Sequence, residues 1–173
     1  MTYRPNQKGK YAQIITFLCI VVAVLLFFAS TKVQMYVFVY QITAIVLMVA
    51  GIEIFMKYVM SDYVYKASEQ DIEIYKVTGN KSVCICSLSY EESVSGVVTR
   101  DYCDSHREKF GKSKITVNYC KNIFPKEYSL YFFNFNSKLA LLKFEPDEAF
   151  TKYMNEKITA AISAKERAES DDE

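Results

Sequence analysis

The chain contains cysteine and histidine residues whose side chains can bind a metal ion. Cys84, Cys86, Cys103 and His106 together offer the sulfur and nitrogen ligands that zinc prefers. The Cys-X-Cys spacing is poor for zinc, and on a strand it places Cys84 and Cys86 on the same face. In a cytoplasmic domain these thiols stay reduced. We therefore interpret them, with Cys120, as apolar core residues and predict no metal site, whereas a reversed topology would favour disulfides.

Nucleophilic catalysis would have to use His106, because the chain has a single histidine. His106 lies in a polar stretch, 104–109, where a solvated side chain is the simpler interpretation. The sequence contains no glycine-rich phosphate loop, no HExxH motif and no paired-carboxylate motif. We predict no catalytic residues, no cofactor and no enzymatic activity.

A basic loop is the strongest surface candidate. Its cations surround Phe110 and are Arg107, Lys109, Lys112 and Lys114. Beside an anionic membrane leaflet each cation contributes about 1 kcal/mol, so the loop is a candidate lipid-headgroup site. Nearby carboxylates oppose this interpretation and favour an ordinary solvated loop; they are Asp101, Asp104 and Glu108.

Two long stretches, 12–30 and 33–52, carry no charged residue. A helix needs about 20 apolar residues to cross the hydrocarbon core of a membrane. The link between the two predicted helices is only residues 31–34, which overlap the start of the second stretch, so we predict a transmembrane hairpin over 12–58 that follows a tail over 1–11. The alternatives are a buried soluble hairpin and a cleaved signal peptide. Against the latter, the first apolar stretch is longer than a signal peptide requires.

Basic residues beside the two stretches set the predicted orientation. The linker carries Lys32 alone, whereas the outer flanks carry Arg4, Lys8, Lys10, Lys57 and Lys66. We therefore expect a multi-pass protein of the cell membrane with both termini in the cytoplasm.

Polar residues inside a span are functional candidates by default. Gln41 shares a helical face with Ala44, Met48 and Gly51, and the first stretch has a similar face formed by Thr16, Cys19, Ala23, Leu26 and Ser30. Such small and polar residues favour helix–helix packing. Glu53 precedes Lys57 by four residues and is expected to pair with it. A proton-carrying role of Glu53 is the alternative.

From residue 62 the hydrophobic period changes to two, which predicts about seven short strands. They are expected over 63–67, 72–77, 82–88, 94–99, 114–119, 128–135 and 138–144, as a meander or a barrel. Pro146 and acidic neighbours then open a helix whose apolar residues recur at helical spacing up to Ile162. We therefore predict a mainly-β (α+β) domain over 62–163 and a charged, fraying tail over 164–173.

The whole chain resembles bacterial membrane proteins in which two N-terminal spans precede a pleckstrin-homology-like (PH-like) domain. The resemblance is carried by four stretches: 62–65 (DYVY), 72–75 (IEIY), 88–92 (LSYEE) and 144–148 (FEPDE). It implies seven strands followed by one helix, no catalytic residues, and a role in protein contact, lipid contact or assembly at the membrane.

These observations favour a non-enzymatic adaptor that binds another protein, or copies of itself, at the inner membrane face. The aromatic strand 128–135 is the expected contact edge. A net charge of +1 gives no electrostatic reason to expect nucleic acid. The alternatives are a lipid-headgroup module using the basic loop, and an accessory subunit of a transporter or membrane enzyme in which Gln41 and Glu53 would matter.

Overall fold

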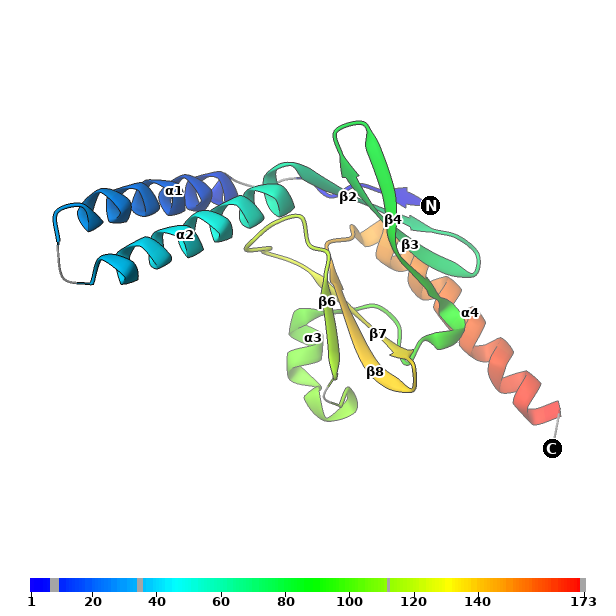
Figure 1. Ribbon diagram of the computed structural model, residues 1–173. Coiled ribbons are helices and arrows are strands. Elements are labelled where there is room, and N and C mark those ends of the chain that lie inside the picture. The colour runs from blue at the N-terminus through cyan, green and yellow to red at the C-terminus, as the bar shows by residue number, and fades with distance from the viewer. Residues whose placement is uncertain (7–9, 34–35, 112, 172–173) are drawn as a thin grey trace. The chain divides into compact units, whose positions relative to one another are not determined.

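The computed structural model (Figure 1) describes residues 1–6, 10–33, 36–111 and 113–171. The chain divides into two compact units. One unit comprises Lys8–Ser61, and the other comprises Met1–Gln7 together with Asp62–Glu173. Each unit is described by itself.

The first unit is a helical hairpin. Helix α1 spans Tyr11–Ser30 and α2 spans Val37–Ile54, and a π-helical turn, η1, continues α2 over Phe55–Val59. Both helices are long and apolar enough to cross a membrane, at 20 residues for α1 and 23 for α2 with η1. These bounds agree with the predicted hairpin to within a residue or two.

Small and polar residues form the contact between α1 and α2. Thr16 and Ala23 of α1 and Ala44 of α2 are buried. A Cβ atom added at Gly51 would lie 3.2 Å from Cys19 Cβ, so the two backbones approach closely at this point. The predicted packing faces are confirmed, except that Met48 remains 43% exposed at the margin of the contact.

The second unit contains two four-stranded sheets and a long helix. The first sheet has the order β1-β2-β3-β4, with bounds Thr2–Tyr3, Ser61–Ala67, Asp71–Thr78 and Lys81–Ser89. The second has the order β5-β7-β8-β6, with bounds Val98–Thr99, Ser129–Phe135, Lys138–Phe144 and Ile115–Asn118. This is an α+β arrangement in which six of the seven strands expected after residue 60 have a close counterpart, whereas the strand expected over 94–99 is only Val98–Thr99.

The eighth strand, β1, was not predicted. Thr2 pairs with Lys66 and Tyr3 with Tyr65, so the N-terminal segment belongs to the first sheet. A strand of two residues has no periodic signal, which explains why the sequence indicated only a tail there.

The second sheet departs from the predicted meander. β6 pairs in parallel with β8, whereas β7 and β8 form the expected antiparallel hairpin. A short helix, α3 over Arg100–Ser105, and a 3-10 turn, η3 over Arg107–Lys109, lie between β5 and β6. These helical turns account for the segment 101–113, which no strand pattern fitted.

The core of this unit lies between the sheets and α4, which spans Glu148–Asp171. Asp147 caps this helix, since its Oδ1 accepts a hydrogen bond from Phe150 N at 2.7 Å. Phe150, Met154 and Ile158 are fully buried and form its core face. Figure 1 shows the C-terminal end of α4 extending beyond the sheets. The helix therefore includes most of the segment that was expected to fray.

A β-bulge in β4 separates the cysteines that were expected on one face. Cys86 pairs with Ile74 and Cys84 with Tyr75, which leaves Ile85 without an opposite residue. Because Ile74 and Tyr75 point to opposite faces of β3, Cys84 and Cys86 do too. Cys84 is exposed and Cys86 is half-buried. The predicted shared face was wrong because strict alternation fails at a bulge.

Candidate functional surfaces

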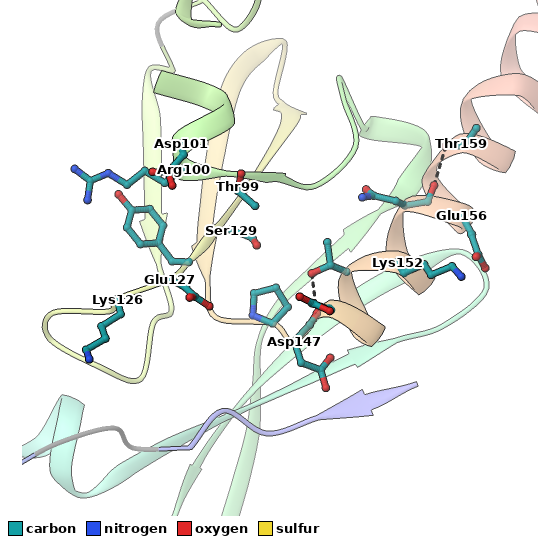
Figure 2. Close-up of a pocket in the computed structure, with 15 residues that line it drawn as sticks. Thr99, Arg100, Asp101, Lys126, Glu127, Ser129, Asp147, Lys152, Glu156 and Thr159 are labelled. Carbon is teal, nitrogen blue, oxygen red and sulfur yellow. Dashed lines mark hydrogen bonds between the residues drawn. The ribbon is translucent and has the colours of Figure 1, made fainter. Parts of the chain in front are cut away.

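An open polar groove of about 1080 Å³ lies between the first turns of α4 and the chain segments that enter α3 and β7. In Figure 2, Lys152, Glu156 and Thr159 come from α4, while Arg100 and Lys126 lie across the groove from them. Its charged lining comprises Arg100, Asp101, Lys126, Glu127, Asp147, Glu148, Lys152 and Glu156. The groove is thus of mixed charge, and cysteine and histidine are absent from the lining side chains that the structure describes.

Several groove side chains already have structural partners. Asn155 fixes the chain before β5, since its Oδ1 accepts from Val97 N at 2.6 Å and its Nδ2 donates to Val97 O at 3.2 Å. Arg100 Nε lies 3.4 Å from Asp104 Oδ2. Over the described ranges, no three His, Cys, Asp or Glu side chains are placed to hold a metal ion.

A second polar cluster holds the loop that leaves β6. Lys121 Nζ lies 2.7 Å from Asp62 Oδ1, and Arg4 also pairs with Asp62. Lys121 keeps only 3% of its side chain exposed. Next to it, Asn122 Nδ2 donates to Glu145 Oε2 at 2.7 Å, and the Glu145 residue is buried. Sequence reasoning missed these groups, because a lysine in a loop and a glutamate before a proline give no sign of burial.

Burial and charge shift the pKa values of several groups near this cluster. Desolvation raises the pKa of Asp62, but hydrogen bonds from Lys121 and Arg4 outweigh it, so the pKa ends below its usual value. Desolvation raises the pKa of Tyr65, whose hydroxyl donates to Tyr119 O at 2.8 Å and accepts from Glu145 N at 3.3 Å. Tyr65 therefore stays a neutral structural phenol.

The predicted basic loop contributes two described cations. Lys109 ends η3, Lys114 immediately precedes β6, and both are exposed. Lys112 and the side chain of Arg107 lie outside the described residues. Asp101, Asp104 and Glu108 are exposed in the same segment, and Asp104 is paired with Arg100.

His106 contacts a neighbouring tyrosine, and Cys86 has a raised pKa. The His106 ring stacks on Tyr102 with centroids 4.3 Å apart, and its Nδ1 lies 3.0 Å from Tyr102 O. Burial, with the Cys84 thiol as a smaller cause, raises the pKa of Cys86 to about 11. Cys86 is therefore a poor source of thiolate at neutral pH.

The two predicted intramembrane polar residues differ in burial. Gln41 is half-buried, whereas Glu53 is exposed on the surface of the hairpin unit. The expected ion pair between Glu53 and Lys57, both of which the structure describes, is not formed. Lys57 Nζ lies 5.2 Å from the centroid of the Tyr58 ring instead. The π-helical turn at Phe55–Val59 explains this, because it alters the four-residue geometry that the pairing required.

The longest strand edge open to a partner belongs to β4. This nine-residue strand ends the first sheet, and its outer side has no strand partner among the described residues. The residues from Lys81 to Cys84 are exposed, with Val83 at 59%. The predicted edge, 128–135, is not free: β7 pairs with β8 on one side and with β5 and Ser93 on the other.

Comparison with models of known protein families, with curated proteins and with solved structures found no match to this chain.

Proposed function

We propose that this chain is a non-enzymatic membrane adaptor. Its hairpin crosses the cell membrane, and its strand-rich unit, a PH-like domain at the inner face, binds a protein partner or a second copy of the chain. The observation that carries the proposal is the open edge of β4.

The β4 edge has the features that strand addition requires. An edge strand presents unpaired backbone N–H and C=O groups, to which an extended segment can add through main-chain hydrogen bonds. Lys81 is the only charged residue of β4, so little electrostatic repulsion opposes an added strand. The bulge at Ile85 interrupts the edge, and the exposed half between Lys81 and Cys84 is therefore the contact segment.

Photo-crosslinking of the full chain in native membranes tests this proposal. A photoreactive residue replaces Val83, and a matched control replaces Phe135, which is 48% exposed outside β4. We expect a discrete adduct from position 83 and none from position 135. An adduct of twice the 20.0 kDa chain mass identifies self-assembly, and another discrete mass identifies a partner.

A charged substitution at the edge separates strand addition from general proximity. With the photoreactive group at Lys81, Val83→Lys should reduce the adduct several-fold, because a lysine on an edge strand opposes pairing. Val83 lies outside the core, so the thermal stability of the chain should not change. Equal adducts from positions 83 and 135, or none from either, would contradict the proposed edge contact.

A further inference from the structure

Helix α2 presents a continuous face of β-branched residues on the side away from α1. Val39, Ile42, Val46 and Val49 recur at spacings of three and four, and each is between 51% and 60% exposed. The residues of α2 that contact α1 lie on the opposite side of the helix. This alternation of three and four is the spacing at which two helices pack side by side in a left-handed pair.

The outward surface of α1 is of a different kind. After Ile14, its most exposed large apolar residues are Phe17, Leu18, Leu25 and Phe28. A valine or isoleucine side chain in a helix has one strongly preferred χ1 rotamer, whereas leucine and phenylalanine populate two. Packing the α2 face against a partner therefore costs less side-chain entropy than packing the α1 face.

Glu53 continues the α2 face and brings a carboxylate into a long apolar helix. It follows Val49 by four residues, is exposed on the hairpin unit, and forms no ion pair with another described residue. It precedes Val59, the last residue of the apolar span, by six residues, or about 9 Å. Ionisable side chains within a span are almost always paired and covered by protein, so this face calls for a protein neighbour.

Lys57 supplies the opposite charge one helical turn further along. Its Nζ lies over the Tyr58 ring and does not pair with Glu53 of its own chain. A two-fold axis along the membrane normal would place equal positions of two α2 helices at equal depth. Glu53 of each copy then lies about 6 Å along the axis from Lys57 of the other, within reach of these two long side chains. The charges of this face are therefore complementary to the same face of a second copy.

We propose that α2 is a self-association site, at which the face from Val39 to Glu53 packs in parallel against the same face of a second copy of the chain. Reciprocal ion pairs between Glu53 and Lys57 close one end of the contact. This inference rests on the hairpin crossing a bilayer, which is part of the proposed function, and it makes no use of the β4 edge.

Photo-crosslinking of the purified full chain in phosphatidylcholine vesicles tests the contact, because no other protein is present. A small diazirine-bearing residue replaces Val46, and the matched control replaces Leu25, which is 61% exposed on α1. Resistance to carbonate extraction establishes beforehand that the hairpin is inserted. At high dilution in lipid we expect an adduct of twice the 20.0 kDa chain mass from position 46, several-fold above that from position 25.

Exchange of the two charges tests the ion pairs. Glu53→Lys and Lys57→Glu should each reduce the adduct from position 46 several-fold, because each brings like charges together across the contact. The double variant should restore the adduct, since it rebuilds both pairs with their charges reversed. Carbonate resistance of all three variants shows that a weaker adduct does not reflect failed insertion.

Equal adducts from positions 46 and 25, adducts with lipid alone, or a double variant as weak as the single variants would each overturn the proposal. Release of the wild-type chain by carbonate would overturn it as well, because its premise would fail. Val83→Lys separates this contact from the β4 edge: the adduct from position 46 should persist, and its loss would show that strand pairing alone brings the hairpins together. The crosslinks from position 83 report separately on the adaptor function.

Discussion

Lys121 is a charged residue that folding removes almost completely from water. Its ammonium group lies against Asp62, whose side chain is 35% exposed and also pairs with Arg4. Removing the Asp62 carboxylate would leave the buried Lys121 ammonium group with less opposite charge beside it. The loss of folding free energy is then larger than the contribution of an exposed ion pair. Asp62 thus fastens the loop of residues 119–128 to the start of β2.

Asp62→Asn should lower the free energy of unfolding by about 1 to 2 kcal/mol at neutral pH. This value is at the lower end of the range for a hydrogen bond between charged groups, because solvent reaches Asp62 and screens the contact. The pKa of Asp62 is depressed in the folded chain. Its stabilisation is therefore present above the unfolded value of about 3.9 and is lost as the pH falls through the lower folded value.

Thermal denaturation of the full chain in detergent, measured over a range of pH, checks this expectation. The difference between wild type and Asp62→Asn should narrow below about pH 4. Asp101→Asn, at an exposed position on α3, serves as the control. A pH-independent difference would show that the carboxylate charge is not what stabilises the loop.

At the scale of elements, the hydrophobic pattern and the length of each segment predicted most of the helices and strands. The two apolar helices and the strands β2, β3, β4, β7 and β8 agree closely with the sequence pattern, because each is long enough to show its period. β1 and α3 were missed, since two residues or six carry too little periodicity. The β4 bulge and the buried Lys121 depend on tertiary partners, so no local pattern indicates them.

Gly51 is the residue on which close packing of α1 and α2 depends. A Cβ at this position would lie 3.2 Å from Cys19 Cβ and 3.7 Å from Thr16 O. Gly51→Leu should therefore separate the helices and destabilise the hairpin by about 1 to 3 kcal/mol, the usual cost of overpacking.

The thermal transition of the detergent-solubilised chain, with Ile45→Leu as a control at a 60% exposed position, measures this effect. The control should behave as the wild type. If Gly51→Leu were equally silent, the contact between α1 and α2 would not require a small residue at position 51.

For the whole molecule, the proposed orientation places the strand-rich unit in the cytoplasm. Cys84 is the exposed cysteine of that unit among the described residues, which makes it a natural reporter. A membrane-impermeant maleimide added to intact cells should leave Cys84 unlabelled, and permeabilisation should allow labelling. Cys84→Ser should remove most of that signal, and labelling of intact cells would reverse the proposed orientation.

The pairing of β1 with β2 links the biogenesis of the two units. Thr2 and Lys66 lie on opposite sides of the hairpin in the sequence, yet they are neighbours in one sheet. If only one of the two helices crossed the bilayer, β1 and β2 would lie on opposite sides of the membrane. The first sheet would then lack β1, its end strand. Under the proposed membrane topology, completion of the sheet therefore excludes insertion of one helix alone, and a chain with a single inserted helix would leave the edge of β2 unpaired.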